Sequence, residues 1–299
     1  MNILLSGATG FVGSNLIKYL EGLSIRKISR DDLMDTNAGL FENAEVIIHL
    51  AGKAHDLKKV SDSKEYYAVN YEITKKLYDQ FLVSKAKKFI FISSVKAVAD
   101  TITGELDEDV VPNPLTHYGK SKLMAEEYIR SHDLPLGKSF YILRPCMIHG
   151  PGNKGNLNLL YQLVKKKIPY PLASFKNKRS FLSVENLCFV ISELILRRDI
   201  SSGVYNIADN EALSTNDVVK ILAKSLNNKV RLWHLAPSII KLIAKLGDAI
   251  HLPLSTERLN KLTESYIVSN AKLVTALGKS LPVTARDGLH VTSNSFKQS

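Results

Sequence analysis

The chain contains very little cysteine: only Cys146 and Cys188 occur among its 299 residues. Metal sites built on cysteine and histidine place their ligands a few residues apart, and no such spacing is present. So few cysteines indicate a reducing compartment. We therefore predict two buried thiols and no bound metal.

Long hydrophobic runs are missing as well. No apolar run reaches the ~18 residues that a bilayer-spanning helix requires. The first ten residues, MNILLSGATG, have neither the charged region nor the cleavage site of a signal peptide. These absences predict a cytoplasmic protein without membrane insertion.

Acidic residues are in the minority, with 29 Asp and Glu against 40 Lys and Arg, which gives a formal net charge of +11. Such a positive charge can favour binding to nucleic acid or to an anionic membrane. The cations are scattered, however, and the longest basic runs are 165–167 and 26–30. A generally basic surface, or pockets for phosphorylated small molecules, explains the charge without nucleic acid.

Short apolar segments alternate with helical patterns through the first half of the chain. The sequence predicts strands at 3–6, 25–29, 45–52, 87–94 and 139–145, and a long helix of 3.6-residue period at 63–86. Strands that are apolar throughout and alternate with helices are typical of a parallel sheet covered on both faces. The predicted fold class is α/β, a doubly wound, Rossmann-type parallel sheet.

A glycine-rich turn, GATGFVG, follows the first strand and opens a helix. Its glycines, Gly7, Gly10 and Gly13, allow the backbone to approach a pyrophosphate, and the helix N-terminus directs free N–H groups at the phosphates. The turn therefore predicts a dinucleotide site.

The periodicity changes after Pro145. We predict a dinucleotide-binding domain of residues 1–150, to which 181–210 returns with a further strand at 204–208. Residues 151–180 and 211–299 would form a smaller, mostly helical substrate-binding lobe.

Several motifs resemble the extended short-chain dehydrogenase/reductase family, in its nucleotide-sugar epimerase, dehydratase and 4-ketoreductase branch. The resemblance rests on the G-x-x-G-x-x-G spacing and on HLAG at 49–52, AVN ending at Asn70, FISSVKA with Ser94, and RPCMIHGPG at 144–152. Tyr118 and Lys122 form the family's Y-x-x-x-K pair, one helical turn apart on one helix face.

The resemblance implies a catalytic set of Ser94, Tyr118 and Lys122. Ser94 would bind the substrate oxygen, Tyr118 would exchange a proton with it, and Lys122 would also bind the nicotinamide ribose. A tyrosine has an ordinary pKa of about 10. We expect the Lys122 ammonium and an oxidised nicotinamide to favour the phenolate.

The same resemblance implies the residues that bind the cofactor. They are Gly7, Thr9, Gly10, Phe11, Val12, Gly13, Arg30, Leu50, Ala51, Gly52, Asn70, Lys122 and Pro145. Arg30, at the end of the second strand, favours NADP(H), because an arginine there suits a 2′-phosphate. Asp31 and Asp32 leave NAD(H) open.

Residues 149–187 resemble bacterial enzymes that reduce the 4-keto group of UDP-4-keto-6-deoxy-N-acetylhexosamine, which implies a role in surface-polysaccharide precursor synthesis. The substrate-binding residues implied are Ser94, Lys96, Asn156, Leu157, Arg179 and Arg258, and His55 is a candidate for the sugar pocket. Lys96 and Met147 resemble the reductase branch rather than the epimerases. A UDP-hexose or UDP-N-acetylhexosamine 4-epimerase remains the alternative.

Residues 237–254 carry the one pattern that suits a membrane surface. Ile239, Ile240, Ile243 and Leu246 can share a helix face that excludes Lys241 and Lys245. Packing in the core or in a homodimer explains this pattern too, and we favour packing. Retention of the Ser, Tyr and Lys set argues against a cofactor-binding sensor without activity.

Overall fold

The main sheet contains six parallel strands in the order β2-β1-β3-β4-β6-β9. The computed structural model describes residues 1–29, 31–32, 41–54, 63–153, 156–250 and 255–297. The strands are β1 Asn2–Ser6, β2 Ser24–Ile28, β3 Val46–His49, β4 Lys88–Ile92, β6 Ser139–Pro145 and β9 Gly203–Ile207. The predicted Rossmann-type α/β fold is confirmed, and each strand predicted from the sequence lies in this sheet.

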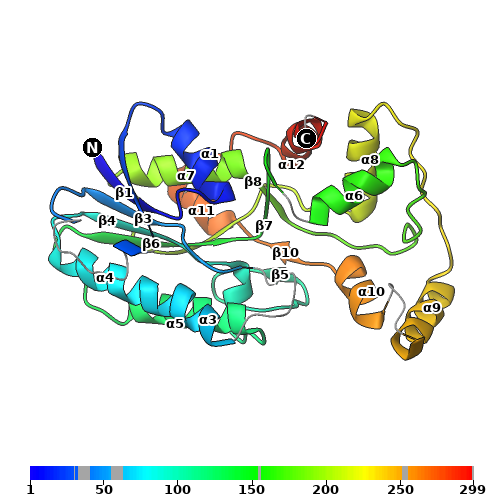
Figure 1. Ribbon diagram of the computed structural model, residues 1–299, viewed down its shortest axis with the longest axis horizontal. Coiled ribbons are helices and arrows are strands. Elements are labelled where there is room, and N and C mark those ends of the chain that lie inside the picture. The colour runs from blue at the N-terminus through cyan, green and yellow to red at the C-terminus, as the bar shows by residue number, and fades with distance from the viewer. Residues whose placement is uncertain (30, 33–40, 55–62, 154–155, 251–254, 298–299) are drawn as a thin grey trace.

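Successive side chains of a strand enter two different helical layers. On β1, Ile3 and Leu5 pack with α1 (Phe11–Tyr19), α7 (Val184–Leu196) and α11 (Ala271–Leu277). Leu4 packs on the opposite face with α4 (Ile73–Val83) and α5 (His117–Arg130). Figure 1 shows these two layers on opposite sides of the sheet. Because both of its faces are buried, the inner strand β3 is apolar up to its last residue, whereas the edge strand β2 exposes Arg26 and Lys27 only on the rim of the sheet.

The predicted helix at 63–86 contains one irregular turn. It consists of α3 (Ser63–Tyr67), a π-helical turn η2 (Ala68–Glu72) and α4. Such wide turns are common at functional sites, since they place an extra residue on the inner face of a helix. Here the buried Asn70 lies in the wide turn.

A second, mostly helical lobe lies at one end of the sheet (Figure 1). Its helices are α6 (Asn156–Lys165), α8 (Thr215–Ser225), α9 (Pro237–Ile250), α10 (Thr256–Thr263) and α12 (Ala285–Ser295), which share a separate core. Two short parallel pairs border it: β5 (Glu105–Leu106) with β10 (Ile267–Val268), and β7 (Met147–His149) with β8 (Phe181–Ser183). The sequence did not predict these two pairs.

The described residues include no helix that is long and apolar enough to cross a membrane. Within the same ranges, no group of three or more His, Cys, Asp or Glu side chains could hold a metal ion. Cys188 is a buried residue and Cys146, which follows the last residue of β6, is a partly buried one. Burial raises the pKa of both thiols, which agrees with the prediction that they are buried.

The hydroxyl of Tyr78 is buried without a hydrogen-bond partner among the described residues. Its ring lies 5.1 Å from that of Phe89, between centroids, and burial raises its pKa to about 12. Tyr141 is equally buried, but its hydroxyl donates to the Ile200 carbonyl at 2.9 Å.

We predict opposite effects of removing these two hydroxyls. Tyr78→Phe should raise the free energy of unfolding by up to ~1 kcal/mol, because a buried group without a partner is removed. Tyr141→Phe should lower it by ~1 kcal/mol or more, because a buried carbonyl loses its donor. Urea unfolding of both variants tests this. A Tyr78→Phe protein as destabilised as Tyr141→Phe would show that the Tyr78 hydroxyl has a partner.

Candidate active site

At two positions of the turn between β1 and α1, no residue larger than glycine fits. Gly7 has a positive φ of 73°, and a Cβ there would lie 2.6 Å from the Ala51 nitrogen. A Cβ at Gly13 would lie 2.2 Å from the Gly7 oxygen. Gly10 caps α1, whose first turn carries no acidic residue. The free N–H groups of that turn and the close backbone therefore fit a pyrophosphate.

The strand order reverses beside this turn. β2 and β3 flank β1, and ligands of doubly wound sheets bind at the carboxyl ends of the strands where the order reverses. Leu50, Ala51 and Gly52 follow β3 and border the turn, as the close approach of Gly7 to Ala51 shows. Of the other predicted cofactor residues, Thr9 is exposed, Phe11 and Val12 are partly buried against the main core, and Pro145 ends β6.

Ser94 and Tyr118 come together at the carboxyl end of β4. Ser94 caps a short 3-10 turn, η3 (Val95–Ala97), where its Oγ accepts from the Lys96 N–H at 3.2 Å. Tyr118 lies in the first turn of α5, which begins after the N-cap Thr116. Ser94 lies close enough to Tyr118 to lower the pKa of its phenol. The two hydroxyls can therefore contact one substrate oxygen together.

Lys122 lies one turn further along α5 and is buried. Its Nζ donates to the Ile92 carbonyl at 2.8 Å and lies 4.7 Å from the centre of the Phe91 ring. A Cβ on Gly52 would lie 2.9 Å from this Nζ. The ammonium thus lies between the ends of β3 and β4. Since Ile92 takes one of its three N–H donors, the others can reach a ligand beside Gly52.

Burial shifts the pKa values of both catalytic candidates. It raises the pKa of Tyr118, and the hydrogen bond from Ser94 lowers that pKa only in part. It lowers the pKa of Lys122 to about 8, and the Glu126 carboxylate opposes this shift. The Lys122 ammonium is directed at Ile92 and Gly52, and it is not among the groups that shift the pKa of the Tyr118 phenol here. The expectation that Lys122 and an oxidised nicotinamide together favour the phenolate stays a prediction.

Asn70 holds the loop after β3 against the catalytic helix. Its side chain accepts from the Lys53 N–H at 2.8 Å and donates to the Lys53 carbonyl at 3.0 Å. It also donates to the Ser121 hydroxyl on α5 at 2.9 Å. The wide turn η2 makes this reach possible. Asn70 therefore positions the backbone beside Gly52, and its Oδ1 would lie 3.1 Å from a Cβ there.

A buried ion pair that the sequence did not single out lies beneath the catalytic residues. Arg144 on β6 donates to Glu126 on α5 through Nε at 3.0 Å and Nη2 at 2.5 Å, and both side chains are at most 2% exposed. The Ser93 hydroxyl donates to the same carboxylate. Two signals were available: an arginine within an apolar strand, and Glu126 four residues after Lys122 on one helix face.

Arg179, the predicted diphosphate ligand, is half-buried and carries an unsatisfied donor. Its Nε is buried with no hydrogen-bond partner among the described residues, and burial lowers its pKa. Its backbone pairs with Leu213, which fixes the position of the chain. A buried N–H of a guanidinium requires an acceptor, and a diphosphate supplies one.

The other predicted substrate residues are less clearly placed. Lys96 is partly buried, with its Nζ donating to the Asp100 carbonyl at 2.6 Å and lying 4.3 Å from the centre of the Tyr266 ring. Leu157 packs in the core of the second lobe, so that only its backbone can face a ligand. Arg258 is exposed on α10. Arg30 and His55, and the side chain of Asn156, lie outside the described part of the chain.

The shift of Lys122 predicts a pH dependence of stability in the cofactor-free protein. Between pH 8 and 10.5, the folded chain has released a proton that the unfolded chain, with its ordinary pKa of 10.5, still binds. The free energy of unfolding should therefore rise with pH in this window relative to Lys122→Met, and the difference should stay constant below it. Urea unfolding at several pH values tests this. Parallel pH profiles of parent and variant would contradict the burial of the ammonium.

Known proteins share both the sequence and the fold. Residues 3–208 match the NAD dependent epimerase/dehydratase family. A Vibrio cholerae UDP-glucose 4-epimerase is 32% identical, over 99% of this chain and 96% of the relative. An Escherichia coli O157:H7 N-acetyl-alpha-D-glucosaminyl-diphospho-ditrans,octacis-undecaprenol 4-epimerase is 31% identical, over 78% of this chain and 75% of the relative.

Solved structures agree in fold. A UDP-glucuronic acid 4-epimerase from Bacillus cereus in complex with NAD superimposes with a TM-score of 0.74 at 23% identity, covering 100% of this chain and 99% of the other. RMD from Pseudomonas aeruginosa complexed with NADPH gives 0.74 at 18% identity, with the same coverage. The match over most of the chain agrees with the glycine turn and the arrangement of Ser94, Tyr118 and Lys122: this chain belongs to the NAD-dependent epimerase/dehydratase family.

Proposed function

We propose that the protein reduces the 4-keto group of a UDP-sugar with a nicotinamide dinucleotide, and that the substrate is a UDP-4-keto-6-deoxy-N-acetylhexosamine. The observation that carries this proposal is the juxtaposition of Ser94 and Tyr118 at the carboxyl end of β4, with the buried Lys122 one helical turn further along α5. A dinucleotide bound on the turn at Gly7–Gly13 would supply the hydride. If the carbonyl oxygen of the substrate contacts both hydroxyls, the carbonyl is polarised and its carbon can accept the hydride.

Tyr118 would be the proton donor in this reaction. Its phenol, whose pKa burial raises, can donate a proton to the alkoxide that develops on O4. Ser94 would bind the same oxygen. An epimerase would use the same tyrosine in both directions, so that the two candidates differ in the fate of the cofactor and not in this residue.

Two features support a nucleotide-sugar substrate. The unsatisfied Nε of Arg179 can donate to a diphosphate. The Lys96 ammonium lies two residues beyond Ser94, above the Tyr266 ring, where it can reach the sugar. The choice of a 4-keto sugar itself rests on the sequence resemblance of residues 149–187 to the ketoreductase branch.

A 4-epimerase is the second candidate. The Vibrio cholerae and Escherichia coli relatives favour it, since both are 4-epimerases. An epimerase keeps its nicotinamide, because the hydride taken from C4 returns to the other face of the same sugar. The two candidates therefore differ in whether the cofactor is consumed.

Tyr118→Phe should fold and bind cofactor but lose at least ~100-fold in kcat/KM, because no phenol proton remains for O4. Tyr128→Phe is the matched control on the same helix, since its hydroxyl donates to Asp79 on α4 at 2.5 Å. The kcat/KM of this control should stay within about threefold of the parent value. Activity of Tyr118→Phe within the same threefold would exclude Tyr118 as the acid.

Purified protein should release its cofactor freely and oxidise about one NADPH for each UDP-4-keto-6-deoxy-N-acetylglucosamine reduced. NADPH absorbance and NMR of the sugar measure both quantities. The protein should not interconvert UDP-GlcNAc and UDP-GalNAc. Tightly bound NAD, together with interconversion of those sugars without added cofactor, would establish the epimerase.

We also propose a preference for NADP(H), supported by Arg30 in the sequence and by Asp32. The Asp32 Oδ2 accepts from the Ser29 N–H and hydroxyl, each at 2.7 Å, which occupies a carboxylate that could otherwise bind an NAD ribose. Arg30→Ala should weaken NADPH binding about tenfold and leave NADH binding unchanged. Isothermal titration tests this, and equal affinities of the parent for both cofactors would refute the preference.

A further inference from the structure

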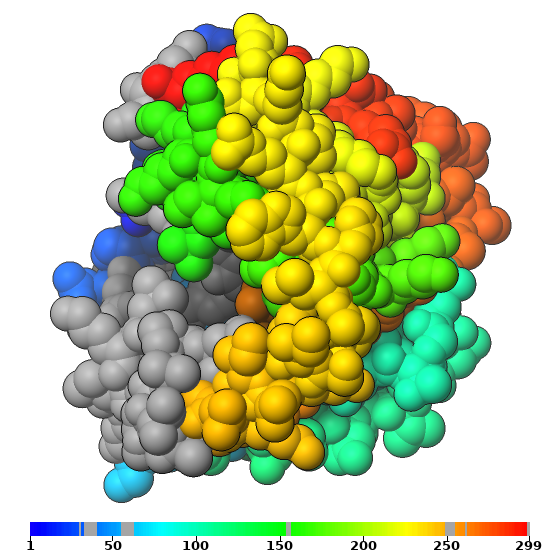
Figure 2. Space-filling model, turned by 90° about the vertical axis from the view of Figure 1, so that its right-hand side faces the viewer, coloured from blue at the N-terminus to red at the C-terminus, as the bar shows by residue number. Residues whose placement is uncertain are grey.

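We propose that residues 229–246 form a docking surface for an anionic phospholipid bilayer. This segment runs from the end of α8 into α9, along the face of the second lobe that Figure 2 turns toward the viewer. None of the residues assigned to the hydride-transfer site lies in it. The proposal is therefore independent of the proposed function.

Helix α9 buries one apolar face and exposes another. Ile240 and Ala244 are 3% and 0% exposed and pack in the core of the second lobe, whereas Leu242 and Leu246 are 60% and 54% exposed. The packing predicted from the sequence accounts for the first face only. A second apolar face that is exposed to solvent is typical of a surface that contacts a partner or a membrane.

The exposed hydrophobic side chains continue toward the N-terminal end of the segment. The set, each at least 40% exposed, consists of Val230, Trp233, Leu235, Ile239, Leu242, Ile243 and Leu246. Trp233, the single tryptophan of the chain, is 55% exposed. Tryptophan and leucine beside lysine are typical of helices that lie in a membrane interface.

The charge of this region has one sign. No Asp or Glu occurs between Asp217 and Asp248, while the stretch carries Lys220, Lys224, Lys229, Arg231, Lys241 and Lys245. Lys241 and Lys245 lie on α9 beside the exposed apolar side chains and are themselves exposed. Anionic headgroups would be attracted to such a surface while its leucines enter the acyl boundary.

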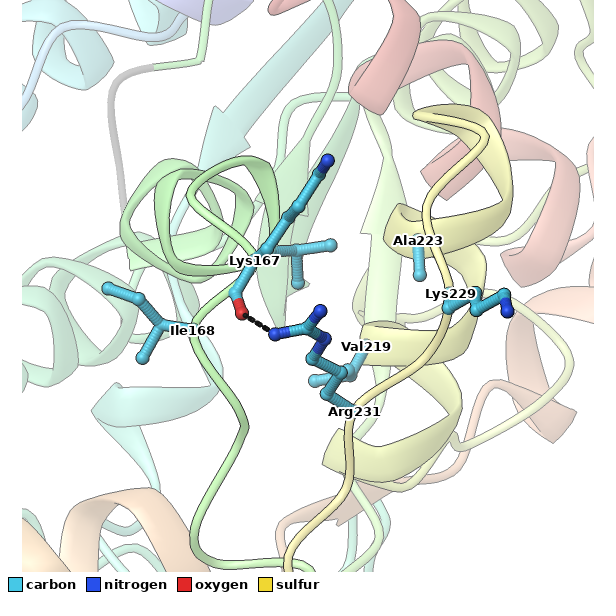
Figure 3. A pocket seen from close by; sticks show the side chains of 7 residues that line it. Lys167, Ile168, Val219, Ala223, Lys229 and Arg231 are labelled. Carbon is cyan, nitrogen blue, oxygen red and sulfur yellow. Dashed lines mark hydrogen bonds between the residues drawn. The ribbon is translucent and has the colours of Figure 1, made fainter.

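Further cations lie next to the exposed apolar side chains. Lys167, Lys229 and Arg231 border a small hollow that Val164 and Val219 also line, with no acidic residue among its lining residues (Figure 3). Arg231 donates to the Lys167 carbonyl at 3.1 Å, which holds its guanidinium at the hollow.

A second copy of the chain is a poorer occupant. A two-fold contact through this surface would oppose the same cationic stretch on both subunits, with no carboxylate in it to pair with. Charge complementarity thus favours a lipid surface over a homodimer through α9.

Co-sedimentation with vesicles, together with the emission of Trp233, tests the proposal. With phosphatidylglycerol/phosphatidylcholine vesicles, the parent should bind at least tenfold more tightly than with phosphatidylcholine alone, and its emission should shift to the blue. Raising the salt from 0.1 M to 0.5 M should weaken binding. These measurements need no variant. A parent that stays in the supernatant with unshifted emission overturns the proposal.

Variants then localise the surface. The double changes Leu242→Glu/Leu246→Glu and Lys241→Glu/Lys245→Glu should each reduce vesicle binding at least tenfold. The control Leu136→Glu alters a fully exposed leucine outside the second lobe and should bind as the parent does. Equal loss in the control, or no loss in either α9 variant, contradicts the assignment. So does a dimer in analytical ultracentrifugation that Leu242→Glu/Leu246→Glu dissociates, if no vesicle binding is seen.

Discussion

The buried carboxylate of Glu126 holds together the elements that carry the candidate catalytic residues. It accepts from Arg144 on β6 and from Ser93, the neighbour of Ser94, and it lies one turn from Lys122 on α5. Removing one partner of such a buried pair typically costs about 3–5 kcal/mol, because the other charge is left unpaired. The Glu126 carboxylate therefore fixes the distances among β4, β6 and α5. The Ser94–Tyr118 contact depends on that fixed geometry.

The second lobe is joined to this frame through Tyr266. Its hydroxyl donates to the Ala99 carbonyl at 2.7 Å, in the chain that follows Ser94 and Lys96, and its backbone pairs with Arg179 beside the short strand β10. One tyrosine thus links the candidate diphosphate arginine to the loop of the candidate catalytic serine. Substrate bound at Arg179 would therefore be positioned relative to Ser94 through the contacts of Tyr266.

The sequence predicted what depends on local pattern. Continuous apolar strands identified the sheet, and the glycine turn and the Tyr118–Lys122 spacing identified side chains that the fold does bring to one edge. It could not predict the short β5–β10 and β7–β8 pairs, which contain only two or three residues each and arise from long-range packing. It also did not predict which face of α9 would be buried, because apolar residues surround most of that helix. Nor could the sequence predict that burial raises the pKa of Tyr118 in the cofactor-free protein, because burial and side-chain direction come from tertiary structure.

The central claim is that this chain moves a hydride directly to C4 of a nucleotide sugar while Tyr118 protonates O4. Transfer from NADPH deuterated at C4 of the nicotinamide to UDP-4-keto-6-deoxy-N-acetylglucosamine tests it most directly. The account predicts one deuterium at C4 of the product sugar, on a single face, and none at other carbons, as read by NMR. Reduction without deuterium at C4, or deuterium on both faces of C4, would contradict it.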